Sequence, residues 1–309
     1  MKKISIVIPA HNEEGNVALV HEKIKEVFSG LEHYHFEIIF VNDGSRDSTQ
    51  QKLEELSRKY EEVKFIEFSR NFGHQPAVKA GMDYADGNAV ISMDGDLQHP
   101  PELIPEMIKK WEEGYDIVYT VRTYPKQISY FKRKTSDVFY KLLSSLSDVN
   151  LTKGGGSDFR LMDANAVEAM RSFKEDDLFL RGLTSWMGYK QIGIDFTAGE
   201  RMAGESSYNL KKMLKFAFTG ITAFSVKPLY LAAYLGFLFS LFSVIGYIAY
   251  VIHSFMVHTE ISGWASLIMT IVFFGGIQLI ILGIIGIYLG KIFKQVKERP
   301  NYIIKNKNF

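Results

Sequence analysis

The sequence contains no cysteine, which excludes disulfide bonds and thiolate metal sites and fits a reducing compartment. Its net charge is only +1 over 309 residues, so no overall field favours nucleic acid as a partner. Neither a Gly-x-Gly-x-x-Gly motif nor a Walker A loop occurs, which removes the main support for a dinucleotide-binding or P-loop protein. Any metal site must therefore be built from oxygen and nitrogen ligands.

Charged residues are also absent from two long stretches near the C-terminus. No Asp, Glu, Lys or Arg occurs from Pro228 to Thr259, and none occurs from Ile261 to Gly290. Within these stretches, residues 229–252 and 264–289 are each long enough to cross about 30 Å of hydrocarbon. We therefore expect a soluble domain followed by a two-helix membrane anchor. The alternative is a hydrophobic hairpin buried inside a soluble protein.

Basic residues flank this anchor on both sides, whereas the loop between the spans, 253–263, has no Lys or Arg. They are Lys211, Lys212, Lys215 and Lys227 before the first span, and Lys291, Lys294, Lys297 and Arg299 after the second. The positive-inside rule then places both flanks and both termini in the cytoplasm, as in a multi-pass protein of the plasma membrane. Small residues in the second span would let membrane helices pack closely in a homo-oligomer. They are Gly275, Gly276, Gly283 and Gly286.

Strand and helix patterns alternate through the first part of the chain. Apolar runs predict strands at 4–8, 36–41, 63–68, 89–93 and 116–121. Helices are predicted at 16–28, 47–60, 76–85 and 102–113, the second of them beginning with a capping box at Asp47 or Ser48. This alternation favours an α/β fold with a mostly parallel sheet.

The strand at 89–93 ends directly on two carboxylates, Asp94 and Asp96. In an open parallel sheet, ligands bind beyond the carboxyl ends of the strands. Hard oxygen ligands at such a place suit Mg²⁺ or Mn²⁺, which commonly bridges phosphates. A solvated Asp-Gly turn is the alternative. An EF-hand loop is excluded, because Pro105 stands where its glutamate is needed.

Two other strand ends carry polar groups, in the segments Pro9-Ala10-His11-Asn12-Glu13 and Asn42-Asp43-Gly44-Ser45. We expect these two loops and 94–96 to converge on one edge of the sheet. Together with Ser69-Arg70-Asn71-Phe72-Gly73-His74-Gln75, they resemble the inverting family-2 glycosyltransferases. Within that family, the chain is similar to the polyprenyl-phosphate group, which includes bactoprenol glucosyltransferase and dolichol-phosphate mannosyltransferase. The resemblance extends over nearly the whole chain, including both apolar segments.

This resemblance implies a GT-A-type catalytic domain over 1–205, a juxtamembrane amphipathic segment over 206–227, an anchor over 228–290 and a cytoplasmic tail over 291–309. It implies transfer of one sugar, with inversion, from a nucleoside diphosphate sugar to undecaprenyl or another polyprenyl phosphate. UDP-glucose is the favoured donor, and N-acetylglucosamine or mannose donors are the alternatives.

The resemblance also implies site residues. Nucleotide-sugar contacts are expected from Pro9, Ala10, Asn12, Glu13, Asp43, Lys79 and Asp94. Mg²⁺ or Mn²⁺ is expected at Asp94, Asp96 and Gln98, and the expected catalytic residues are Asp96 and Asp158. Asp158 would act either as a base or as a group that orients the sugar or the acceptor. The chain departs from the family pattern at His11, where tyrosine is usual, at Gly95, where alanine is usual, and at Ser207, where lysine is common.

Acceptor contacts are expected from Arg122, Arg133, Ser136 and Arg201. Guanidinium groups pair bidentately with phosphate. The segment 128–146 has the pattern of an amphipathic helix with a basic side, suited to an anionic membrane surface, and an ordinary surface helix is the alternative.

Two other enzymes and one non-enzyme are weaker interpretations. A processive polysaccharide synthase would have a Gln-x-x-Arg-Trp signature, which this sequence lacks. A phosphatase of the haloacid-dehalogenase type also ends a strand on Asp-x-Asp, but it has Thr or Val where Gln98 stands. A non-enzymatic membrane scaffold would need no acidic set at the sheet edge.

Overall fold

Eight strands form one sheet in the described part of the chain, in the order β7-β5-β6-β4-β1-β2-β3-β8. The computed structural model describes residues 1–123, 157–176, 178–197, 225–257 and 263–309. The strands are β1 Lys2–Ala10, β2 Tyr34–Asn42, β3 Val63–Phe68, β4 Ala89–Ser92, β5 Ile117–Thr123, β6 Arg160–Asp163, β7 Gln191–Thr197 and β8 Ile304–Lys307. The pairs β1·β2, β1·β4, β2·β3 and β5·β7 are parallel. Strand β6 runs antiparallel to both β4 and β5, and β8 runs antiparallel to β3.

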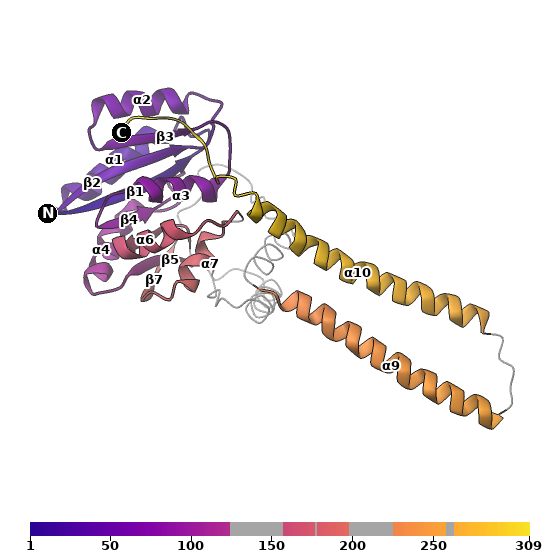
Figure 1. Ribbon diagram of the computed structural model, residues 1–309. Coiled ribbons are helices and arrows are strands. Elements are labelled where there is room, and N and C mark those ends of the chain that lie inside the picture. The colour runs from indigo at the N-terminus through magenta and orange to yellow at the C-terminus, as the bar shows by residue number, and fades with distance from the viewer. Residues whose placement is uncertain (124–156, 177, 198–224, 258–262) are drawn as a thin grey trace.

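Helices cover both faces of this sheet (Figure 1). They are α1 Val17–Ser29, α2 Thr49–Lys59, α3 His74–Tyr84, α4 Ile104–Glu112, α6 Ala164–Ser172 and α7 Leu180–Trp186, with a short 3₁₀ turn at Pro101–Leu103 before α4. Successive side chains of a strand point to opposite faces. Ile6 of β1 therefore joins a buried cluster with α1, α2 and α4, whereas Val7 joins a second cluster with α3, α6 and α7.

The predicted α/β fold with a mostly parallel sheet is confirmed, and one local prediction is only partly correct. The expected capping box at Asp47 or Ser48 forms only in part, because among the described residues Ser48 makes no capping hydrogen bond and Gln50 bonds Asn42 and Glu54 and not the Asp47 N–H. Asp47 does act as a cap, since its Oδ1 accepts the Thr49 N–H (3.1 Å) and the Thr49 hydroxyl (2.6 Å). Strands β6, β7 and β8 were not predicted from the sequence.

Two long helices, α9 Lys227–Val257 and α10 Trp264–Val296, extend side by side away from the α/β domain (Figure 1). Both are long and apolar enough to cross a membrane, over Lys227–Tyr250 and Thr270–Val296. Only 6% and 0% of their most apolar windows are buried. This exposure contradicts the alternative of a hydrophobic hairpin buried in a soluble protein and agrees with association with a membrane.

After α10 the chain returns to the sheet, and its C-terminus lies beside β3 (Figure 1). Strand β8 pairs with β3 through Glu67 opposite Asn306 and Phe68 opposite Ile304. The predicted tail, 291–309, therefore contains the last turn of α10 and an edge strand of the domain.

Candidate active site

The carboxyl ends of β1 to β5 and the start of β6 lie along one edge of the sheet. The register shows this directly, since Ser92 of β4 lies opposite Arg160 of β6, and Arg160 lies opposite Tyr119 of β5. Asp94, Asp158 and Arg122 follow or precede these positions by two or three residues. Because β6 is antiparallel to its neighbours, its first residues reach the edge where the other strands end.

The loops after β1 and β2 are joined by hydrogen bonds, as expected from the sequence. The Asp43 N–H donates to the Ala10 carbonyl (2.9 Å), and the Asn12 N–H donates to Ser45 Oγ (3.0 Å). The Glu13 N–H donates to Thr49 Oγ1 (2.9 Å). Asn12 has a positive φ of 58°, a left-handed conformation that asparagine tolerates better than most residues. These contacts bring the two loops together at the predicted edge.

The carboxylate of Asp43 is buried and holds the loop 69–73. Its two oxygens accept the backbone N–H groups of Phe72 (2.6 Å) and Gly73 (2.9 Å). Gly44 has a φ of 60°, and a Cβ at this position would lie 2.4 Å from the carbonyl carbon of Arg70. Asp43 and Gly44 thus fix the backbone that leads into α3.

The acidic loop after β4 presents its two carboxylates differently. Asp96 is exposed, and its oxygens accept the backbone N–H (3.1 Å) and the side-chain amide (2.7 Å) of Gln98. Asp94 is partly covered, and burial raises the pKa of its carboxyl group; His99 and His74 oppose this rise, and the charges of Asp158 and Asp96 add to it. A bound cation would offset this clustering of like charge. Leu97, directly after Asp96, has a φ of 58°, which strains this short loop.

His99 joins this acidic loop to β6. The Asp94 N–H donates to His99 Nδ1 (3.0 Å), so this nitrogen is an acceptor and the proton lies on Nε2, 2.8 Å from Ser157 Oγ. Burial lowers the pKa of His99, in agreement with a neutral ring. The imidazole also stacks on Phe159, with 5.3 Å between the ring centroids.

Asp158 is held by a bidentate ion pair. Arg181 donates to it through Nε (3.0 Å) and Nη2 (2.8 Å), and Gln75 donates through Nε2 (3.4 Å). Burial would raise the pKa of Asp158, but the hydrogen bonds to His74 and Arg181 outweigh it and hold the pKa well below 3.8. The carboxylate is therefore ionised and fixed in orientation, which suits a positioning group better than a base.

His74, at the start of α3, lies between the two acidic groups. Its Nε2 is 3.5 Å from Asp94 Oδ1 and 3.5 Å from Asp158 Oδ2. Burial would lower the pKa of His74, but the hydrogen bond to Asp158 and the charges of Asp94 and Asp158 outweigh burial and raise it. His74 thus links the acidic loop to Asp158.

The structure does not bring every predicted residue to this edge. Lys79 is buried, pairs with Asp83 and lies 3.4 Å from the Arg171 carbonyl, beside α6. Pro9 and Ala10 do lie at this edge, at the end of β1, but both are buried. Arg133, Ser136 and Arg201 lie outside the described residues.

Residues that the sequence did not single out include His74, His99, Ser157 and Arg181. The two histidines stand within recognisable motifs, so their places in the chain were a usable signal. Arg181 has no local motif and is 23 residues from Asp158.

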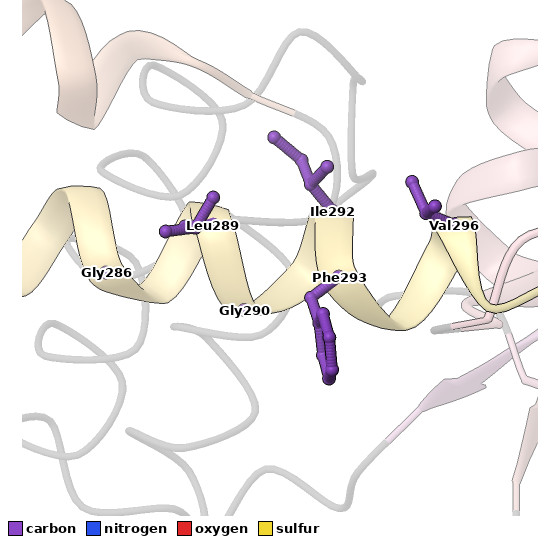
Figure 2. A pocket seen from close by; sticks show the side chains of 6 residues that line it. All are labelled: Gly286, Leu289, Gly290, Ile292, Phe293 and Val296. Atoms are coloured by element: carbon purple, nitrogen blue, oxygen red, sulfur yellow. The ribbon is translucent and has the colours of Figure 1, made fainter.

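A cavity of about 580 Å³ lies on α10, away from the carboxylates. It is lined by Gly286, Leu289, Gly290, Ile292, Phe293 and Val296. Figure 2 shows Ile292 and Val296 pointing one way and Phe293 the other, and the spacing of 289, 292, 293 and 296 places all four on one face of α10. The lining is almost wholly apolar, so this cavity suits hydrocarbon and not a nucleotide.

The sheet order and the acidic edge define a GT-A-like fold. A solved mannosyltransferase, PcManGT from Pyrobaculum calidifontis in complex with GDP-Man and Mn²⁺, shares it with a TM-score of 0.52 and 15% identity. That match covers 72% of this chain and 63% of the mannosyltransferase, less than two thirds of its length. At this identity the likeness concerns the fold alone.

The family follows from the sequence. Residues 5–171, more than half of the chain, match glycosyl transferase family 2, and the chain belongs to that family. It is 47% identical over 301 residues to the uncharacterized glycosyltransferase YkcC of Bacillus subtilis strain 168, covering 97% of this chain and 93% of YkcC. It is 39% identical over 304 residues to the bactoprenol glucosyl transferase of Shigella phage SfV, covering 98% of each. The chain is thus a glycosyltransferase, as the sequence motifs indicated.

Proposed function

We propose that this chain transfers one glucose from UDP-glucose to a polyprenyl phosphate, with inversion, at the cytoplasmic face of the plasma membrane. The observation that carries this proposal is the 39% identity to a bactoprenol glucosyl transferase over 98% of both chains, including both apolar helices. Mannose and N-acetylglucosamine donors remain the alternatives within the same reaction. The acidic edge and the exposed helices together support an enzyme whose donor is soluble and whose acceptor is a lipid.

Asp94 and Asp96 are the residues that would bind Mg²⁺ or Mn²⁺ in this proposal. Among the described residues, no three His, Asp or Glu side chains form a complete metal site. This fits a divalent ion held by one or two carboxylates, with phosphate and water oxygens as its other ligands. Held there, such an ion would offset the charge that develops on the departing diphosphate. In this structure the Gln98 amide donates to Asp96, so Gln98 orients that carboxylate.

Asp158 would orient the reacting groups without removing a proton. A phosphate monoester is largely ionised near neutral pH, so the acceptor oxygen needs no strong base. Arg181 keeps Asp158 ionised and fixed, and His74 connects it to Asp94. The acceptor oxygen would attack the anomeric carbon opposite the departing diphosphate, which inverts that carbon.

The acceptor side is supported by the membrane helices and by Arg122. Arg122 lies near the end of β5, at the same edge as the carboxylates, where a guanidinium group can pair with a lipid phosphate. Arg133, Ser136 and Arg201 remain predicted acceptor contacts, and nucleotide contacts from Glu13 and its neighbours remain predictions as well. The basic flanks of both spans support a cytoplasmic active site.

Direct transfer tests this proposal. The full-length protein in lipid nanodiscs would be incubated with undecaprenyl phosphate and radiolabelled UDP-glucose, UDP-N-acetylglucosamine or GDP-mannose, each with Mg²⁺, Mn²⁺ or EDTA. We expect labelled lipid with UDP-glucose in either metal, none in EDTA, and an inverted anomeric configuration by NMR. If only a different donor labels the lipid, the sugar of that donor replaces glucose in the proposal. Hydrolysis of the nucleotide sugar without labelling of the lipid would contradict the proposed acceptor.

A further inference from the structure

The end of the chain is part of the sheet that carries the active site. Besides the β3·β8 pairing, the Asn308 side chain makes two hydrogen bonds to the start of β3. Its Oδ1 accepts the Phe65 N–H (2.7 Å), and its Nδ2 donates to the Val63 carbonyl (3.3 Å). Lys305 forms an ion pair with Glu67 (2.6 Å). The last residues thus contact β3 along its whole length.

Tyr302 and Ile303 extend this contact to the point where β3 ends. The Tyr302 ring stacks on Phe68 with 5.2 Å between centroids and an angle of 10° between the planes. Its hydroxyl donates to Asp83 Oδ2 (2.9 Å). The Ser69 N–H donates to the Ile303 carbonyl (3.0 Å). The last residue of β3 and the first residue of the next loop are therefore both held by the chain end.

From Phe68 the contacts continue into the active site. Phe68 meets Phe72 edge to face, with 5.6 Å between the ring centroids. The backbone of Phe72 and Gly73 is bound by the Asp43 carboxylate, and the next residue, His74, lies between Asp94 and Asp158. Loop 69–73 is thus held by Asp43 on one side and by Phe68 with Tyr302 on the other.

The helix that precedes this segment is also attached to the domain. Gln295, in the last turn of α10, accepts the Asp176 N–H through Oε1 (3.0 Å) and donates to the Lys174 carbonyl through Nε2 (2.8 Å). The chain end therefore starts from a helix whose position on the α/β domain is fixed.

We propose that residues 302–309, here called the C-terminal brace, position loop 69–73, with Tyr302 as the main positioning residue. Through this loop and Asp43, which binds it, the brace fixes the donor-binding part of the active site in position relative to membrane helix α10. That this part of the site binds a nucleoside diphosphate sugar rests on the proposed function. That the brace positions loop 69–73 does not depend on it. Affinity for the donor then depends on residues that follow the membrane anchor in the chain.

A simpler role for the brace is to cover the open edge of β3, since unpaired edges promote association with other chains. The two roles predict different effects of equivalent substitutions. Phe309 is a matched control, because it is also an aromatic residue of the brace, but its ring packs edge-on against Tyr84 of α3 (6.0 Å between centroids). If the brace only covers the edge, Tyr302→Leu and Phe309→Leu should have the same effect on loop 69–73.

Hydrogen exchange of the full-length protein in nanodiscs tests the brace without reference to catalysis. Loss of one aromatic pair in Tyr302→Leu should speed exchange of the Phe72 and Gly73 amides about three- to tenfold. Tyr302→Phe keeps the stack and should stay near the wild type, and so should Phe309→Leu. Equal acceleration in Tyr302→Leu and Phe309→Leu, or none in either, would overturn the proposal.

Binding and kinetics then connect the loop to the donor. In Tyr302→Leu, the dissociation constant for UDP, measured by calorimetry, and the KM for the nucleotide sugar should rise about three- to tenfold, with the KM for polyprenyl phosphate unchanged. A rise in the lipid KM alone would contradict the brace. If the wild type does not bind UDP at all, the proposed donor is wrong, and the exchange data still decide whether the brace positions the loop.

Discussion

The pair formed by Asp158 and Arg181 makes a quantitative prediction about catalysis. Arg181→Gln removes two charge-assisted hydrogen bonds, of 3.0 and 2.8 Å, from a carboxylate that is only 12% exposed. Each such bond contributes about 1.5–3 kcal/mol. Because the Arg181 side chain is 34% exposed, water replaces part of the loss. We therefore expect a net effect of about 2–3 kcal/mol, a fall of about 30- to 150-fold in kcat/KM for the acceptor.

A double-mutant cycle measures this prediction. Initial rates of lipid glycosylation would be compared for the wild type, Arg181→Gln, Asp158→Asn and the double variant. If Arg181 acts by orienting Asp158, its loss should cost little once the Asp158 charge is gone, so the double variant should be no worse than Asp158→Asn alone. Additive losses would refute this reasoning and give Arg181 a separate contact with substrate.

The pH profile provides a second check on the same pair. In the folded protein the pKa of Asp158 is held well below 3.8, so the contribution of the pair is complete above the unfolded value and is lost only as the pH falls through the depressed one. Wild-type activity should therefore show no acid limb from Asp158 between pH 5 and pH 8. In Arg181→Gln the pKa rises, and the acid limb of kcat/KM should move to higher pH.

Three further predictions concern the metal, the tight turn and the membrane topology. Asp96→Asn should abolish transfer while leaving the protein folded and membrane-bound; full activity, or undiminished turnover in excess chelator, would contradict the metal assignment. Gly44→Ala should lower stability by about 2–4 kcal/mol in thermal unfolding, because its Cβ would lie 2.4 Å from backbone at a positive φ. Gly95→Ala should change stability by under about 0.5 kcal/mol, because the new Cβ would lie 3.4 Å from its nearest neighbour, an ordinary contact distance. Equal losses of stability in the two glycine variants would contradict both predictions. Cysteine at Thr259 should react with an impermeant thiol reagent in intact cells and cysteine at Asn301 should not, and the reverse labelling would place the active site outside.

The sequence predicted those parts of the fold whose signal is local. The first five strands are apolar runs, and each was placed within a few residues of its observed bounds. Strand β6 has only four residues and begins with the buried charge of Arg160, so no apolar run marks it. Strand β8, with the sequence Ile-Lys-Asn-Lys, has no strand pattern and exists because β3 offers an unpaired edge.

The same distinction applies to the candidate site. The residues at strand ends, such as Asp43 and Asp94, could be placed because parallel strands end at one edge. Arg181 could not be placed, because its pairing with Asp158 depends on how α7 packs beside β6. Lys79 was expected at the site from the family resemblance, yet its position on α3 directs it toward Asp83 and α6.

The return of the chain end to β3 also determines the order in which the domain can be completed during synthesis. Phe65 and the residue that binds its amide, Asn308, are 243 residues apart in the chain. At about 5–20 residues per second, the ribosome needs about 10 to 50 seconds to add that length. Both membrane helices are made in this interval, so they leave the ribosome before the sheet has its eighth strand. The nascent domain must therefore keep an open β3 edge until residues 304–308 have been made, and a chain that stops before them keeps that edge permanently.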